Sequence, residues 1–206
     1  MAATVRKTMW RKVPKEVAEN VEVIITCLPS VKALEDVVHG ENGILSARHR
    51  DLIVIESSTF PLEDKLRIYS ELADNGITML DCPISGTGAQ AVSKDLSIYV
   101  SGDKGAFEQC VDVFNGYSRS HYYLGEYGYG SKMKYVANLL VSIHNVSAAE
   151  AFVLGMKSGL AAEDIYRVIS DGAGSSRMFE VRGPLMVSGE DEDYDKATMK
   201  VDIWQK

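Results

Sequence analysis

Short apolar runs alternate with amphipathic segments through the first eighty residues of the chain. Residues 21–28, 52–55 and 77–80 are rich in β-branched and aliphatic side chains, as buried parallel strands are. Between them, residues 31–38 and 62–72 place apolar side chains at the three- and four-residue spacing of a helical stripe. The order strand, helix, strand, helix, strand predicts βαβ units and a doubly wound parallel sheet.

After these units the pattern continues with shorter elements and then changes character. A strand is predicted at 96–100, a helix around 106–114 and a short strand at 121–124. From 133 to 158 the chain is apolar nearly all round. This predicts a long helix that is covered on several sides, in a domain core or a subunit interface. A further helix is predicted at 162–170, with acidic residues in its first turn.

The fold class that follows is α/β, with a partial Rossmann-type doubly wound sheet followed by an all-helical domain. The change of pattern falls at a glycine-rich turn. We therefore expect one domain over residues 1–128 and a second, helical domain over residues 129–206.

The composition is that of an ordinary globular protein, and it excludes some classes of partner. The chain has 206 residues and a net charge of -7, which argues against a nucleic-acid partner because that function needs a basic surface. No uninterrupted apolar run reaches the ~18 residues that span a bilayer, so no membrane association is expected.

The three cysteines are widely spaced and the four histidines are scattered, so neither a disulfide framework nor a metal site is expected. A reduced, cytoplasmic setting is the simplest fit. The basic first fifteen residues leave a mitochondrial location open.

Candidate chemistry lies where the glycine turn opens into the long helix. Lys134 and Asn138 are four residues apart and share one helical face. A lysine on an apolar helix can have its pKa lowered by desolvation, which makes Lys134 a candidate general acid or base with Asn138 as its partner. The ordinary alternative is a solvated lysine. Lys132 is a poorer candidate, since two residues turn a helix by about 200°.

Ligands of doubly wound sheets bind at the carboxyl ends of the strands. One such end is the loop over residues 81–88, where Ser85, Thr87 and exposed N–H groups suit a carboxylate or a phosphate. A tight turn that needs its glycines is the alternative. Residues 57–59 follow another strand and could equally cap the next helix. Residues 175–176 form another hydroxyl-rich turn, and a helix cap is its default explanation.

Taken together, four segments in this order resemble the β-hydroxyacid dehydrogenase family, which includes 3-hydroxyisobutyrate and 6-phosphogluconate dehydrogenases. They are Ile25-Thr26-Cys27-Leu28-Pro29-Ser30, Ser57-Ser58, Asp81-Cys82-Pro83-Ile84-Ser85-Gly86, and the spaced set Gly125, Gly128, Gly130, Lys134 and Asn138.

The resemblance implies roles for particular residues. Lys134 would exchange a proton with the substrate hydroxyl while hydride passes to or from NAD or NADP, and Asn138 would hold substrate and lysine in place. Ser85, Gly86 and Thr87 would bind the carboxylate of a small hydroxy acid. The cofactor would be lined by Leu28, Pro29, Ser58 and Lys206. The resemblance also makes residues 1–128 a partial dinucleotide-binding domain and residues 129–206 an incomplete substrate and dimerisation domain.

The sequence departs from the family pattern in several places. Thr87 stands where the family has a second glycine, Gln90 and Lys94 replace two later glycines, and Ala137 replaces the first of two asparagines. Residues 1–20 contain no glycine, so the pyrophosphate-binding turn of the family is missing. We expect one more βαβ unit before this chain and more helices after it. We also expect weak or no cofactor binding by the 206 residues alone.

Three functions remain open from the sequence. The first is an NAD(P)-dependent oxidoreductase acting on a small β-hydroxy acid or its semialdehyde, working as a homodimer or higher homo-oligomer. The second is a non-catalytic dimerisation or binding module derived from such an enzyme, which the missing glycine turn favours. The third is an imine reductase, against which Lys134 counts because those enzymes generally replace that lysine.

Overall fold

The structure is a computed structural model that describes residues 13–47, 51–86 and 88–189. The helices are α1 Pro14–Ala18, α2 Val31–His39, α3 Leu62–Asp74, α4 Gly88–Val92, α5 Lys104–Gln109, α6 Val111–Tyr117, α7 Tyr129–Lys157, α8 Ala162–Ser170 and α9 Arg177–Ser188, with a 3-10 turn η1 at Ile44–Ser46. The strands are β1 Val23–Thr26, β2 Ile53–Glu56, β3 Thr78–Asp81, β4 Ile84–Ser85, β5 Ser97–Val100 and β6 Ser120–Tyr123.

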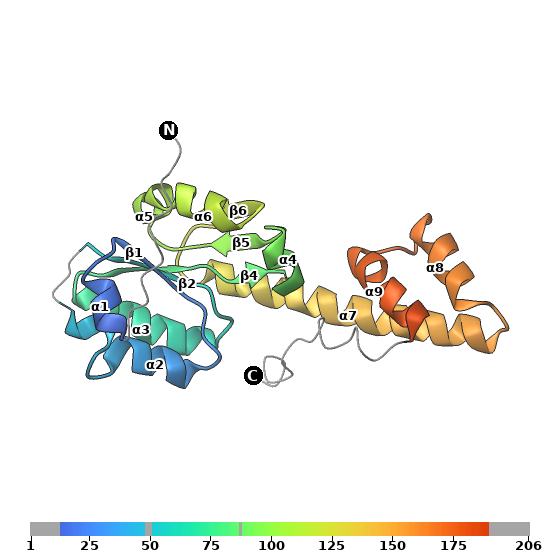
Figure 1. Cartoon of the computed structure of the whole chain (residues 1–206), viewed down its shortest axis with the longest axis horizontal. Coiled ribbons are helices and arrows are strands. Elements are labelled where there is room, and N and C mark those ends of the chain that lie inside the picture. The colour runs from blue at the N-terminus through green and yellow to red at the C-terminus, as the bar shows by residue number, and fades with distance from the viewer. Residues whose placement is uncertain (1–12, 48–50, 87, 190–206) are drawn as a thin grey trace.

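The first three strands form the predicted parallel sheet in the order β1-β2-β3. One face, with Val54 and Met79, packs on α2 and α3, while the other, with Ile55 and Leu80, packs towards β5, α5 and α6. This alternation places helices on both sides of the sheet, as Figure 1 shows. The expected α/β class with a Rossmann-like sheet is confirmed.

The remaining strands form a second sheet that the sequence pattern did not predict as separate. Its order is β4-β5-β6, with β4 antiparallel and β6 parallel to β5. The two sheets meet at an isolated antiparallel bridge between Asp81 and Ser101. The predicted helix around 106–114 is two helices in the structure, because the helical conformation is interrupted at Cys110 between α5 and α6.

Helix α7 begins at the glycine turn and connects both parts of the molecule (Figure 1). Its start packs on β3 and β5, and its far end packs on α8 and α9 around Phe152, Ile165 and Phe179. The predicted helix at 162–170 is confirmed as α8. Ser176 caps α9 by accepting from the N–H of Phe179, as its default explanation had it.

The described chain does not cover the middle of α7 on several sides, so of the two expected covers only the subunit interface stays a prediction. The exposed large apolar side chains of α7 are Tyr129, Met133, Tyr135, Val136, Leu139, Leu140, Ile143, Val146, Val153, Leu154 and Met156. Within the described residues α7 is also long and apolar enough, by length and composition, to cross a bilayer.

Candidate active site

The start of α7 is shaped by a left-handed glycine. Gly128 precedes the helix with φ of 94°, and a Cβ there would lie 2.8 Å from a methyl carbon of Leu62. Only glycine combines that backbone conformation with such close packing. The turn therefore fixes the direction in which the first residues of α7 leave the sheet.

Lys134 and Asn138 lie on one face of α7, as their spacing predicts. Asn138 is only 7% exposed and Lys134 is half-buried. Burial lowers the pKa of the Lys134 ammonium group below its ordinary value. This raises the fraction of neutral amine at a given pH, which is the form that can accept a proton.

Lys132 has a different environment, although it stands only two residues away. It is exposed, and its Nζ lies 4.8 Å from the ring centroid of Tyr129, in a cation–π contact at the surface. The two lysines therefore point to different surroundings, and only Lys134 shares a face with Asn138.

The predicted substrate loop begins directly after β3. Ser85 pairs with Ser97 in the second sheet, and Gly86 follows with φ of 140°. A Cβ at Gly86 would lie 2.5 Å from a methyl carbon of Leu96, so this position requires glycine. Thr87 lies outside the described residues.

The residues that follow this loop are joined by side-chain hydrogen bonds to Asp95, and one of them, Gln90, is a position where the sequence departs from the family pattern. Gln90 Nε2 donates to Asp95 Oδ2 at 3.1 Å, and Arg119 Nε donates to Asp95 Oδ1 at 2.7 Å. Lys94 adopts φ of 58°, in the left-handed region that glycine prefers. The backbone shape expected of a glycine is thus retained at this lysine.

The predicted cofactor-side residues come together at the ends of β1 and β2. The hydroxyl of Ser58 accepts a hydrogen bond from the N–H of Leu28 at 2.8 Å, and Ser58 is buried. Pro29 follows on the exposed surface. The alternative that residues 57–59 cap the next helix is wrong, since α3 begins after Pro61 without a side-chain cap. Lys206 lies outside the described residues.

A buried ionic cluster beneath the site was missed by the sequence analysis. Lys65 Nζ donates to Asp81 Oδ1 at 2.6 Å and to the carbonyl of Ser58 at 3.0 Å, and it forms an ion pair with Glu56 Oε2 at 2.6 Å. All three ionised side chains are fully buried. A signal was present, since Lys65 falls on the buried stripe of α3 with Ile68 and Leu72.

The cluster continues to the start of α7. Asp81 Oδ2 accepts from the N–H of Ser131 at 2.7 Å, and Oδ1 accepts from the Ser131 hydroxyl at 2.8 Å. Asp81 is also the residue that precedes the substrate loop. The elements that carry Ser85 and Lys134 therefore meet at this one carboxylate.

Comparison with known proteins decides the family. A profile described as the NAD binding domain of 6-phosphogluconate dehydrogenase matches residues 2–125, which is more than half of the chain. The chain belongs to the β-hydroxyacid dehydrogenase family. A second profile, described as NAD-binding of NADP-dependent 3-hydroxyisobutyrate dehydrogenase, matches residues 128–206.

Individual members of the β-hydroxyacid dehydrogenase family match over much of this chain. The L-threonate dehydrogenase of Cupriavidus necator is 35% identical over 178 residues, which are 86% of this chain and 60% of that protein. A crystal structure of 3-hydroxyisobutyrate dehydrogenase from Salmonella typhimurium is 28% identical, with a TM-score of 0.76, covering 86% of this chain and 62% of that one. Psf3 in complex with NADP+ and 2-OPP is 25% identical, with a TM-score of 0.81, over 87% and 64% of the two chains. The chain thus spans about 60% of the length of such relatives.

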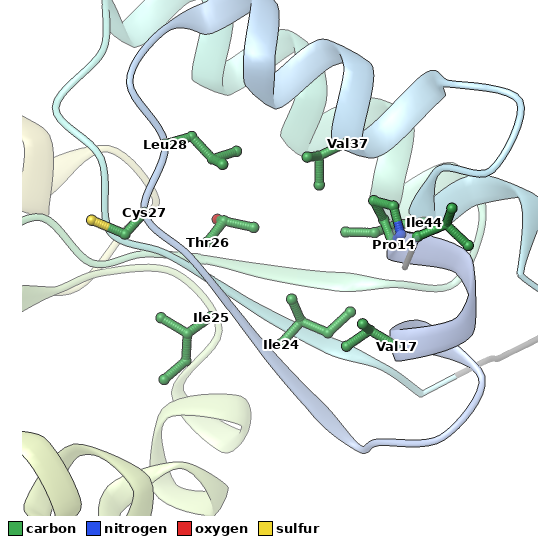
Figure 2. A pocket seen from close by; sticks show the side chains of 10 residues that line it. Pro14, Val17, Ile24, Ile25, Thr26, Cys27, Leu28, Val37 and Ile44 are labelled. Atoms are coloured by element: carbon green, nitrogen blue, oxygen red, sulfur yellow. The ribbon is translucent and has the colours of Figure 1, made fainter. Parts of the chain in front are cut away.

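The described part of this family member leaves a cavity beside its first strand. A cavity of about 490 Å³ runs along β1, lined by Ile24, Cys27 and Leu28 among others (Figure 2). The next helix, α2, is capped by Ser30, whose hydroxyl accepts a hydrogen bond from the N–H of Ala33. The proposed cofactor residues lie at the strand ends, while no glycine turn for pyrophosphate follows β1 in the described chain.

Proposed function

We propose that this chain forms part of an NAD(P)-dependent oxidoreductase that transfers hydride between the nicotinamide and a small β-hydroxy acid or its semialdehyde. The observation that carries the proposal is the half-buried Lys134, whose pKa burial lowers and which shares a helical face with the buried Asn138. Relatives named as hydroxy acid dehydrogenases support an enzyme over a non-catalytic module.

The nicotinamide supplies the hydride acceptor or donor of the reaction when it is bound. In oxidation, the neutral Lys134 amine removes the proton from the substrate hydroxyl, and in reduction its ammonium group returns that proton to the same oxygen. Asn138 has an amide that can donate to the substrate oxygen and hold it within reach of Lys134. This division of roles suits a lysine in an environment that disfavours its charge.

The substrate carboxylate would bind at the loop after β3. The backbone of Gly86, in a conformation closed to other residues, and the hydroxyl of Ser85 are donors suited to a carboxylate. Thr87, by its place in the sequence, would add a second hydroxyl. A small hydroxy acid is therefore the proposed substrate class.

The cofactor would meet this chain at the ends of β1 and β2. Leu28 and Pro29 would line the nicotinamide side, with Ser58 holding Leu28 in place from below. Lys206 keeps the cofactor role that the family resemblance gives it. Both NAD and NADP remain compatible with these contacts.

The exposed apolar side of α7 supports a homo-oligomer as the functional form. Side chains such as Leu139, Ile143 and Val146 are each more than half exposed in the described chain. A contiguous apolar strip of this kind is typical of a surface that another element or another subunit covers. A second copy of the chain is the proposed partner.

The activity is tested in a fusion that places the first βαβ unit of the Cupriavidus necator L-threonate dehydrogenase before residue 13 of this chain and the C-terminal helices of that protein after residue 206. Purified fusion protein is incubated with NAD or NADP and a panel of small hydroxy acids, and reduced nicotinamide is measured by absorbance. We expect turnover with at least one acid. Lys134→Met should lower kcat by about a hundredfold or more, since general acid–base catalysis contributes that much.

Lys132→Met is the matched control, because it removes a lysine from the same helix without touching the shared face of Lys134 and Asn138. It should leave kcat within about twofold of the parent, like most exposed substitutions away from a site. Equal activity of the Lys134→Met and parent proteins would refute the proposed role. Absence of turnover with every acid and both cofactors would refute the dehydrogenase function itself.

A further inference from the structure

The start of α7 is capped from a distant part of the chain. Its own N-cap residue, Gly128, has no side chain that could accept a hydrogen bond from the first turn. The N–H of Ser131 instead donates to Asp81 Oδ2 at 2.7 Å, fifty residues earlier in the sequence. The N–H of Gly130 donates to the hydroxyl of Ser101 at 2.9 Å, which itself donates to Asp81 Oδ2 at 3.2 Å. These contacts satisfy N–H groups that a helix start leaves without partners.

The charges of the cluster agree with this capping role. Glu56 and Asp81 carry two negative charges against the single positive charge of Lys65, so the buried group has a formal charge of −1. That excess faces the positive end of a helix of 29 residues. Each carboxylate also accepts from a backbone N–H, that of Ser58 for Glu56 and that of Ser131 for Asp81. The helix start therefore helps to compensate a charge that burial would otherwise disfavour.

Asp81 also fixes the two elements that carry the proposed chemistry. Its backbone N–H and C=O both pair with Ser101 at 2.9 Å, which joins β3 to the end of β5. The loop with Ser85 leaves the sheet directly after Asp81. Lys134 lies three residues after Ser131, less than one helical turn along α7. A Cβ at Gly130 would lie 2.8 Å from the carbonyl oxygen of Asp81, so the helix is seated directly on this residue.

We propose that Asp81, held by Lys65, is a positioning residue that sets the distance between the substrate loop and Lys134. The catalytic part of this inference rests on the proposed function, while the capping part stands on the contacts alone. Misplacing a catalytic group by about 1 Å can cost about a hundredfold in rate, so such a fixed link matters for turnover.

Two substitutions test the inference. Ser131→Ala removes the hydroxyl bond to Asp81 Oδ1 and a side-chain contact with Tyr135, but it keeps the backbone bond to Asp81 and is expected to fold. Asp81→Asn keeps the shape and an acceptor oxygen but removes the charge that faces Lys65 and the helix start. Ser147→Ala is the matched control, since it removes a serine hydroxyl from the exposed side of the same helix, where it donates only to the carbonyl of His144.

The first readout is hydrogen exchange of the 206-residue chain, which needs no activity. In Ser131→Ala we expect the amides of residues 129–134 to exchange about tenfold faster, which corresponds to about 1.4 kcal/mol and is the size of one lost hydrogen bond. Asp81→Asn should raise exchange at the same residues by more. Residues 145–157 and the control variant should stay within about twofold of the parent protein.

The second readout is the acetylation rate of Lys134 against pH, with the exposed Lys132 as an internal reference in the same peptide. If Asp81 positions Lys134, the acetylation rate of Lys134 in both variants should become more similar to that of the exposed Lys132. In the active fusion, Ser131→Ala should lower kcat about tenfold or more with little change in KM.

Unchanged exchange and unchanged Lys134 reactivity in both variants would overturn the inference. Faster exchange along the whole chain, in proportion to lost global stability, would also overturn it, because Asp81 would then act only as a core group. If the parent fusion turns over no hydroxy acid, the proposed function fails, and exchange and acetylation still decide the capping role of Asp81. If Asp81→Asn fails to fold, Ser131→Ala decides alone.

Discussion

The Ser58 hydroxyl accepts a hydrogen bond from the Leu28 N–H at 2.8 Å and so joins the carboxyl ends of two neighbouring parallel strands. Ser58 is buried, and its own N–H donates to Glu56 at 2.9 Å. The residue therefore links the surface that would meet the nicotinamide to the ionic cluster beneath it. Its role in this structure is to shape the loop, with Leu28 and Pro29 presented above it.

Ser58→Ala is predicted to destabilise the chain by about 1–2 kcal/mol, because the partly buried N–H of Leu28 loses its acceptor. The loss should be seen as a lower urea midpoint and as faster amide exchange at residues 28–30. Ser93→Ala is the control, since the Ser93 hydroxyl donates to the carbonyl of Gln90 at the surface. Equal midpoints for the two variants would show that the Leu28 contact contributes nothing to stability.

Lys65→Met is predicted to destabilise the fold by about 3–5 kcal/mol, because it leaves Glu56 and Asp81 as two buried carboxylates without a cation. Burial alone would lower the pKa of Lys65, but the two carboxylates outweigh it and raise the pKa. A raised pKa means that the stabilisation is present at neutral pH and is lost only as pH rises through that raised value. Urea unfolding across neutral and alkaline pH measures both effects.

Lys32→Met provides the comparison for Lys65→Met. Lys32 forms an exposed ion pair with Asp36 on α2, and such pairs are worth little, so the free energy of unfolding should change by less than about 0.5 kcal/mol. A Lys65→Met protein as stable as Lys32→Met would contradict the charge balance derived for the cluster.

Local pattern was enough to predict the parallel sheet and the pairing of Lys134 with Asn138 on one face. Both depend only on side-chain period within a segment. The antiparallel pairing of β4 with β5 was not predicted, because it is decided by contacts between segments distant in sequence. The extent of helix α9 was not predicted either, although a cap was expected at residues 175–176, since Gly183 and Pro184 interrupt its pattern while Gly183 packs against Tyr166.

The buried cluster shows a second limit of sequence reasoning. A lysine is almost never fully buried unless it is paired, so the place of Lys65 on the apolar stripe of α3 does not predict its burial until its partners are known. Its partners come from two different strand ends, and no local pattern brings them together. The capping of α7 by Asp81 was hidden for the same reason. The glycine turn predicted where α7 starts, but it did not predict that Asp81 caps this helix.

The rate of hydroxy acid oxidation by the active fusion is predicted to rise with pH and then level off. Because burial lowers the pKa of Lys134, the neutral amine that accepts the proton accumulates below the ordinary pKa of lysine. Reduction needs the ammonium form, so its rate should fall over the same pH range. Measuring kcat against pH in both directions gives the midpoint of each change. A midpoint at the ordinary pKa of lysine would contradict the burial of Lys134 in the working enzyme.

Gly130→Ala is predicted to destabilise the chain by about 1–3 kcal/mol and to loosen the start of α7. An added Cβ would lie 2.4 Å from the carbonyl oxygen of Tyr99, and backbone atoms give way less easily than flexible side chains. Gly116→Ala is the control, since Gly116 lies in α6 with nothing within 4 Å of an added Cβ. That change should be neutral or stabilise by up to about 1 kcal/mol, because alanine is the better helix former. Urea midpoints and amide exchange at residues 129–134 separate the two variants. Similar behaviour of both would mean that α7 is not seated against β5 as closely as the structure has it.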